Sequence, residues 1–96
     1  MRYKLKMKDV IEDHKAAEKH FFDKETMDFW DSKIETELIN NEFFITSEDN
    51  FDRTEKLYSI RRYNWDTHNI ETVSFQQFKT LNAAMETLMK FIGETK

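Results

Sequence analysis

Three histidines are the residues of this chain whose type and spacing could support metal chemistry. They are His14, His20 and His68. A zinc-binding helix carries two histidines four residues apart, whereas His14 and His20 are six apart and lie on different helix faces. His14 and Glu18 have the required spacing, but two ligands do not make a zinc site. The chain also has no Cys, which excludes thiolate sites and disulfides. We therefore expect structural histidines, no metal and no other cofactor.

Nucleophilic and acid–base catalysis have equally weak support. Gly93 is the only glycine, so neither a nucleophile elbow nor a glycine-rich phosphate loop is present. Carboxylate pairs such as Glu35 and Glu37, or Glu48 and Asp49, arise by chance in a chain with 19 acidic residues. A small single domain also leaves little room for a deep pocket. The sequence therefore predicts no catalytic residue, and we expect a protein that is not an enzyme.

The distribution of charge is more informative than its total. The net charge is −4, but residues 9–55 carry fifteen acidic and five basic side chains, whereas both flanking segments are net basic. Such a segment is either a solvated surface or one that attracts a basic partner. For the second case, the candidate partner-binding residues are five carboxylates and two aromatic anchors: Glu35, Glu37, Glu48, Asp49, Asp52, Phe51 and Trp65.

A basic and aromatic run offers single-stranded nucleic-acid binding as the alternative. Its candidate residues are Lys56, Arg61, Arg62 and Trp65, on and after an expected strand. Aromatic stacking beside phosphate-binding arginines is how sheet surfaces hold single strands. The arginines could instead pair with the acidic half of the chain, and no RNA-binding strand motif is present. We therefore rank direct nucleic-acid binding below protein binding.

Two helix starts are indicated in the first third of the chain. Asp9, with an acidic residue three positions later, has the form of a capping box and predicts a helix over residues 9–20. Asp23 is a second N-cap signal and predicts a short helix over residues 24–31. The alternation of apolar and basic side chains over residues 2–7 fits either an edge strand or an early helical turn.

The middle of the chain has the pattern of an antiparallel meander. Strands are predicted over four segments: residues 32–38, 42–47, 56–63 and 70–75. Because the chain has no Pro, the turns must come from Asn, Asp and Ser. Asn40-Asn41 can supply the positive φ angles that the first hairpin turn needs.

The last segment has a clear helical period. Five apolar residues step by three or four positions: Phe78, Leu81, Met85, Leu88 and Ile92. Thr80 is expected to cap this helix and Gly93 to end it. Packing on the sheet is favoured over dimerisation because the pattern is only about two heptads long. We predict one α+β domain over residues 1–96, with an N-terminal helix, a short second helix, a four-stranded antiparallel meander and a C-terminal amphipathic helix on one sheet face.

One stretch resembles a known family. Residues 20–32, HFFDKETMDFWDS, resemble an F-F-x-x-x-T-M-x-F/W pattern found in a family of small, uncharacterised bacteriophage proteins. The similarity covers most of the chain and continues in three further pieces: Phe44–Glu48 (FITSE), Tyr58–Tyr63 (YSIRRY) and Phe75-Gln76. Lys19 or His20 stands where the family has a small residue before the paired Phe.

The resemblance implies a phage accessory protein that acts in the host cytoplasm, and it implies no reaction. It assigns structural roles, as a helix cap, core anchors and a strand end, to the pattern residues Thr26, Met27, Phe29, Ser32, Thr46, Ser47 and Glu48. No apolar run has the length of a membrane span, so we expect no membrane association. We expect a non-enzymatic protein that binds a host protein through its acidic surface and inhibits a nucleic-acid-guided defence nuclease, as anti-CRISPR proteins do.

Overall fold

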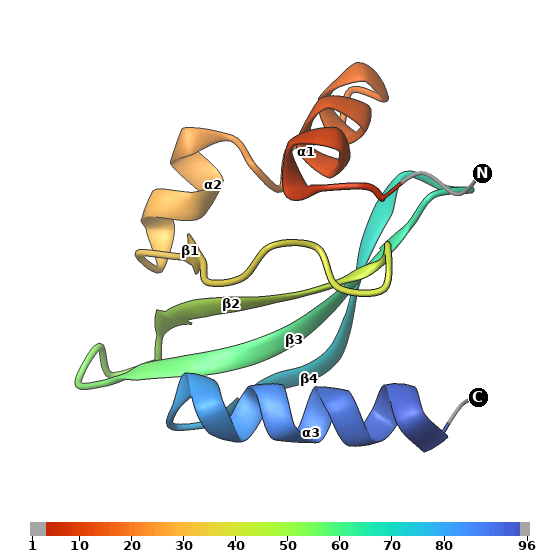
Figure 1. Ribbon diagram of the computed structural model, residues 1–96. Coiled ribbons are helices and arrows are strands. Elements are labelled where there is room, and N and C mark those ends of the chain that lie inside the picture. Colours follow the sequence, from red (N-terminus) through yellow and green to blue (C-terminus); the bar gives the residue numbers. More distant parts are fainter. Residues whose placement is uncertain (1–3, 95–96) are drawn as a thin grey trace.

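The protein folds as an α+β domain with helices on both faces of one sheet. The computed structural model describes residues 4–94. Its elements, in chain order, are α1 (Met7–Ala16), α2 (Lys24–Phe29), β1 (Lys33–Ile34), β2 (Phe43–Asp49), β3 (Lys56–Asn64), β4 (Asn69–Phe78) and α3 (Leu81–Glu94). The four antiparallel strands lie in the order β1-β2-β3-β4, with α3 on one face and α1 and α2 on the other (Figure 1). The predicted meander and the C-terminal helix on the sheet are confirmed.

The face under α3 is sealed by an apolar cluster. Its buried members are Phe43, Ile45, Ile60, Ala84 and Leu88, from β2, β3 and α3. Thr80 caps α3 as expected, since its Oγ1 accepts the Ala83 amide at 3.1 Å. The predicted stop at Gly93 is wrong, because α3 continues to Glu94 and no described glycine has a positive φ.

The opposite face is covered by α1 over only part of the sheet. Met7 and Val10 of α1 pack with Leu38, Phe44 and Tyr63 in a second buried cluster. Because helices lie on both faces, the six β2 residues from 43 to 48 are all buried. Alternating residues of β2 and β3 therefore point into two different cores.

The start of α1 differs from the prediction. The helix begins at Met7 with Lys6 as N-cap, so Asp9 is the third helical residue and its Oδ2 accepts the Lys6 amide at 2.9 Å. Glu37, thirty residues away, accepts the Met7 amide at 2.6 Å. The sequence pattern could not reveal Glu37 as this acceptor, because only the tertiary fold brings it next to Met7. Residues 4–6 are neither strand nor helix, and residues 2–3 lie outside the described part of the chain.

Residues with left-handed backbone angles end α1 and α2 earlier than predicted. Glu18, with a φ of 63°, follows α1, and Asp31, with a φ of 51°, follows α2. The first predicted strand shortens to β1, because the Ile45 amide next to it donates to the Thr36 side chain at 3.1 Å rather than to a backbone carbonyl. The Asn40-Asn41 turn is confirmed, with φ angles of 55° and 60°.

The apolar seal between α3 and the sheet gives a stability prediction. Leu88→Ala removes a fully buried side chain and should lower the free energy of unfolding by about 2–5 kcal/mol. Met89→Ala, at the neighbouring exposed position, should change it by less than about 0.5 kcal/mol. Urea denaturation followed by circular dichroism measures both values. Equal effects of the two substitutions would contradict the packing of α3 on the sheet.

Candidate functional site

The candidate site is a pocket between α2 and the part of the sheet that α1 leaves open. Its volume is about 300 Å³. The lining residues come from the α1–α2 connection, α2 and the segment after it, all three long strands and the β2–β3 loop: Phe21, Thr26, Met27, Trp30, Ser32, Glu48, Asp49, Phe51, Arg61, Phe75 and Gln76. Segments far apart in the sequence therefore meet at one cavity.

A buried ion pair forms the base of this pocket. Arg61 Nη2 donates to Glu48 Oε1 at 3.1 Å, and both residues are buried. The other bonds of the pair come from hydroxyl groups of the three long strands: Arg61 donates to Thr46 at 3.1 Å and to Thr72 at 2.7 Å, and Glu48 accepts from Thr46 at 3.1 Å and from Ser59 at 2.5 Å. Buried charges are tolerated when they are paired and fully hydrogen-bonded, as these are.

Aromatic rings flank the guanidinium group of the pair. The Arg61 Cζ lies 5.5 Å from the centre of the Phe21 ring and 5.7 Å from that of Phe75, both within cation–π range. Phe75 lies where the register between β3 and β4 shifts. Gln76 beside it has a φ of 51° and donates its amide to Ser59 Oγ at 2.8 Å. Such bulges redirect side chains, and this one brings Phe75 to the pocket.

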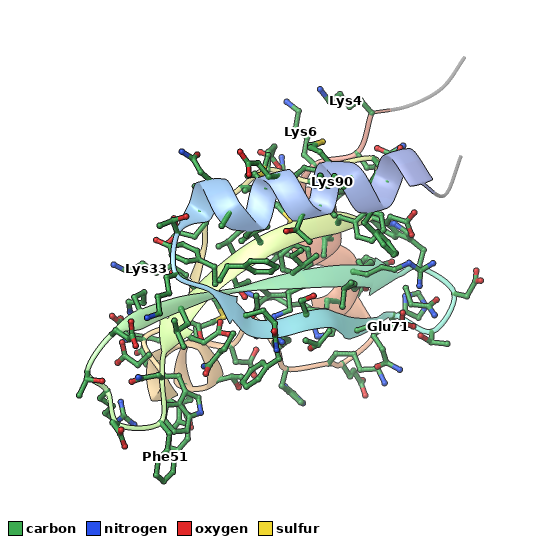
Figure 2. All side chains as sticks on the ribbon, turned by 90° about the horizontal axis from the view of Figure 1, so that it is seen from below. Lys4, Lys6, Lys33, Phe51, Glu71 and Lys90 are labelled. Carbon is green, nitrogen blue, oxygen red and sulfur yellow. The ribbon has the colours of Figure 1, made fainter. Side chains whose placement is uncertain are left out.

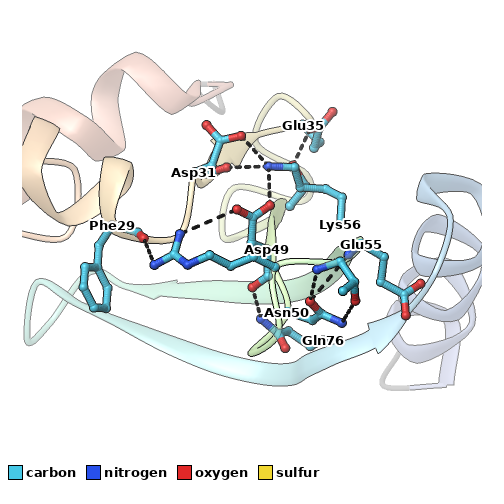
Figure 3. A network of polar contacts seen from close by, with 11 residues as sticks. Phe29, Asp31, Glu35, Asp49, Asn50, Glu55, Lys56 and Gln76 are labelled. Carbon is cyan, nitrogen blue, oxygen red and sulfur yellow. Dashed lines mark hydrogen bonds and ion pairs between the residues drawn. The ribbon is translucent and has the colours of Figure 1, made fainter.

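The β2–β3 loop carries Phe51 at its tip and is held in place by hydrogen bonds. Asn50 Oδ1 accepts the Thr54 amide at 2.9 Å. Arg53 donates to the Phe29 carbonyl at 3.0 Å (Figure 3). Its guanidinium carbon lies 4.8 Å from the centre of the Trp30 ring. Phe51 itself is 86% exposed and points away from the molecule at the end of the loop (Figure 2). The loop is therefore fixed while its aromatic side chain is left to solvent.

Lys56 ties the same loop to the turn after α2. Its Nζ lies 2.6 Å from Asp31 Oδ2 and 3.1 Å from Asp49 Oδ1 (Figure 3). Burial alone would lower the pKa of Lys56, but the hydrogen bonds to Asp31 and Asp49 outweigh it and raise the pKa. Gln76 completes the network by donating to the Asp49 carbonyl at 3.1 Å. Lys56 is therefore a structural cation.

The five carboxylates proposed from sequence do not form one open surface. Glu48 is buried, Asp49 is paired with Lys56, and Glu35 accepts the Ser47 hydroxyl at 2.6 Å. Glu37 is exposed, yet it binds the amides of Met7 and Leu38, which lower its pKa. Asp52 remains in the exposed β2–β3 loop beside Phe51. Most carboxylates of the predicted acidic surface therefore stabilise the fold.

Other exposed acidic residues lie on the segments that contribute to the pocket or directly beside them, and sequence reasoning missed them. They are Glu25, Asp28, Asp31 and Glu55, of which Asp28 pairs with Lys24 and Asp31 with Lys56. Residues 20–35 and 48–56 together, here called the acidic–aromatic end, carry nine acidic and four basic residues, a net charge of −5. Glu25 and Asp28 fall within the short helix predicted after Asp23, and their place in this helix could have identified them as exposed acidic residues.

The four residues of the nucleic-acid alternative are dispersed. Arg61 is buried under the pocket, whereas Arg62 binds Glu42 at 2.6 Å and Glu71 at 2.8 Å. Trp65 is half-buried, and its Nε1 donates to the Asn41 carbonyl at 2.9 Å. The pairing of the arginines with acidic residues is confirmed. Because Trp65 is half-buried, its ring offers less surface for the proposed anchor role than the 86% exposed ring of Phe51.

The histidines have structural contacts. His14 is buried, with Nδ1 2.8 Å from the His68 carbonyl and Nε2 accepting the Phe21 amide at 3.2 Å. These bonds require the neutral Nδ1–H tautomer, and burial lowers the pKa of His14. His68 Nδ1 and the Tyr63 hydroxyl both lie 2.7 Å from one oxygen of Asp13. Within residues 4–94, no three potential metal ligands come together.

Four pieces of the sequence pattern meet at this site. Residues 20–32 form one wall, Phe75-Gln76 forms the facing wall, and the segments Phe44–Glu48 and Tyr58–Tyr63 supply the buried polar residues beneath. Thr26, Met27 and Ser32, assigned cap and core roles from the sequence, line the pocket instead. The N-cap of α2 is Asp23.

Comparison with known proteins identifies a family for nearly the whole chain. The family described as "Family of unknown function (DUF7447)" matches residues 6–89, and the chain belongs to it. No curated protein and no solved structure matches the chain. None of the helices within residues 4–94 combines the length and the apolar content needed to cross a membrane.

The buried ion pair gives a prediction that separates it from surface pairs. Arg61→Met leaves the Glu48 carboxylate buried without its counter-ion and should destabilise the protein by about 3–5 kcal/mol. Replacing both residues by Met should restore at least about half of that loss, because no buried charge then remains. Arg62→Met is the matched control and should cost at most about 1 kcal/mol, since Arg62 and its partner Glu71 are solvent-accessible and its partner Glu42 is only half-buried. Denaturant midpoints of the four proteins test this, and a double variant no more stable than Arg61→Met would contradict it.

His14 predicts how stability depends on pH. Its pKa is lowered in the folded protein, so the unfolded chain binds the proton first as the pH falls below about 6.5. Stability should be complete above that value and fall as the pH decreases through the lowered pKa. His14→Gln should remove this slope while leaving the loss below about pH 4 that the lowered pKa of Asp13 contributes. Thermal unfolding between about pH 3 and pH 8 measures both effects, and parallel curves for the two proteins would refute the role of His14.

Proposed function

We propose that this member of the DUF7447 family is a non-enzymatic protein-binding module that binds its partner through the acidic–aromatic end. The observation that carries the proposal is Phe51, which is 86% exposed on a loop fixed by Asn50, Arg53 and Lys56. On a flexible loop, the exposure of one side chain would not indicate an interface. A fixed loop that presents a bare aromatic ring has the form of an interface anchor.

Two other exposed phenylalanines support the same surface. Phe29 at the end of α2 is 62% exposed, and Phe75 on β4 is 57% exposed. Arg53 connects the loop of Phe51 to Phe29 by its bond to the Phe29 carbonyl, and Phe51 and Phe75 line one pocket. Aromatic residues within a charged rim are the composition that protein interfaces favour.

The charge of this surface favours a basic partner. The acidic–aromatic end has a net charge of −5. Spaced negative charges speed the approach of a positively charged surface and repel phosphate groups. Direct nucleic-acid binding is disfavoured on the same ground, and the arginines that would support it are paired with carboxylates.

The partner we propose is a host protein that handles nucleic acid, specifically a nucleic-acid-guided defence nuclease. The resemblance to small phage proteins supports the host setting, which is the cytoplasm. An acidic surface of this kind can occupy the basic groove in which such a nuclease holds its nucleic acid. Inhibition then follows from occlusion, so the protein needs no catalytic group of its own.

A capture experiment tests the binding surface. The wild-type protein immobilised on resin should retain a host protein, and Phe51→Ala with Phe75→Ala should reduce its recovery about tenfold or more, since these rings are the anchors. Met89→Ala removes an exposed apolar side chain from α3, on the opposite face, and should leave recovery unchanged. Quantitative mass spectrometry measures recovery. Undiminished recovery with the double variant would refute this surface.

The retained partner then tests the mechanism. If it is a nuclease, its cleavage of target DNA should stop at equimolar wild-type protein and continue in the presence of the double variant. A mobility shift with single-stranded DNA and RNA serves as the control for the alternative. Salt-sensitive binding of the oligonucleotides by the protein alone, without capture of any protein, would overturn the proposed function.

A further inference from the structure

We infer that the pocket beside α2 receives one large apolar side chain from a partner segment in which lysine or arginine flanks that side chain. The inference rests on the proposed function and deepens it, because it gives the protein partner a recognition element. It follows from the shape of the pocket, the state of its buried charges and the charge around its opening.

The walls of the pocket are apolar and come from opposite directions. Phe21, Met27 and Trp30 line one side, and Phe51 and Phe75 line the other. The volume of about 300 Å³ is at the lower limit of ligand pockets, which suits a single aromatic or long aliphatic side chain. Filling pockets of this kind with one anchor residue is how binding energy concentrates at protein interfaces.

The buried charges at the base select against an anionic occupant. The Arg61 guanidinium is neutralised by Glu48 at 3.1 Å and also donates to two threonine hydroxyls. In the described part of the chain, no buried side-chain polar atom lacks a hydrogen-bond partner. The base therefore offers no unpaired group to a carboxylate or phosphate, and an apolar side chain loses nothing by lying against it.

The surroundings of the opening select basic neighbours for that side chain. Exposed carboxylates stand next to lining residues in the sequence: Glu25 precedes Thr26 on α2, and Asp52 follows Phe51 in the β2–β3 loop. Asp28 follows Met27 on α2 and is paired with Lys24 at 2.5 Å. Residues on both sides of an inserted anchor would lie close to these groups. Lysine or arginine is favoured at those positions, and aspartate or glutamate is excluded by like-charge repulsion. The same charge disfavours insertion of a base from a nucleic-acid strand, because the phosphates of that strand would be repelled.

The pocket is formed before a partner binds. The backbone N–H of Phe21 donates a hydrogen bond to His14 Nε2, and its ring makes an edge-to-face contact with Phe22, whose ring centre lies 5.0 Å away. Trp30 is held under the Arg53 guanidinium at 4.8 Å. These two fixed side chains lower the cost of ordering the pocket on binding, whereas the 86% exposed Phe51 ring is not held in this way.

Short peptides test the inference directly. Acetyl-Lys-Trp-Lys-amide, titrated to about 5 mM into ¹⁵N-labelled protein, should shift the amide signals of Thr26, Ser32 and Gln76 at the pocket lining. Acetyl-Glu-Trp-Glu-amide, with reversed charge, and acetyl-Lys-Ala-Lys-amide, without the apolar anchor, should each bind at least about tenfold more weakly. Added salt should weaken the first peptide most.

A pocket-filling variant locates the binding. Thr26 is exposed and lines the pocket, so Thr26→Trp should fill the pocket without disturbing the core and weaken the first peptide about tenfold. Thr87→Trp makes the same substitution at an exposed position of α3, on the opposite face of the sheet (Figure 1), and should change affinity by less than about threefold.

The outcomes separate the inference from the proposed function. Absence of shifts at these amides, equal binding of the charge-reversed peptide, or equal effects of the two tryptophan variants would overturn the pocket inference. So would saturable binding of oligothymidylate at the same amides, which would identify a nucleobase as the occupant. If the phenylalanine variant still abolishes capture of the host protein in any of these cases, the proposed function stands and only the pocket assignment fails.

Discussion

The buried pair of Arg61 and Glu48 is the constraint on which the rest of the structure depends. Two buried charges on the α2 face of the sheet are tolerated only when every remaining hydrogen bond is supplied. The hydroxyl groups of Thr46, Ser59 and Thr72, on the three long strands, supply these bonds. A slip of one residue between strands would turn these groups to the α3 face. The pair therefore fixes the register, and through the register it fixes where the pocket walls lie.

The two faces of the sheet serve different purposes because they are closed differently. Under α3, apolar side chains of β2, β3 and the helix pack together, which contributes stability. On the other face, α1 covers one end of the sheet. At the other end, the pocket lies between the short α2 and the strands, and the buried Arg61–Glu48 pair stands where an apolar core would otherwise form. An incompletely filled face over a fixed base leaves a pocket, and the acidic and aromatic residues of α2 and the β2–β3 loop surround it. The stabilising apolar core and the proposed recognition site thus occupy opposite sides of one sheet.

Local patterns predicted most of the fold and little of the site. The period of α3, the asparagine turn and the strand alternation depend on neighbouring residues, so they were visible in the sequence. The start of α1 was misplaced because Glu37 caps it from a distance. Phe51 was identified as an anchor, and its exposure in the structure supports that role. The sequence could not distinguish Trp65 from Phe51, because only the burial of Trp65 and its hydrogen bond to the Asn41 carbonyl set the two residues apart.

The sequence by itself determined the class of the fold, the helix that seals one face, the absence of cysteine chemistry and the region of negative charge. These follow from residue type and short-range period. Tertiary structure alone decided which charges are spent on stability and which remain for a partner. Glu48 and Glu25 look alike in the sequence, yet one is buried against Arg61 and the other faces solvent. The physical reason is that burial and ion pairing depend on residues brought together across the sheet, and no local pattern encodes those distances.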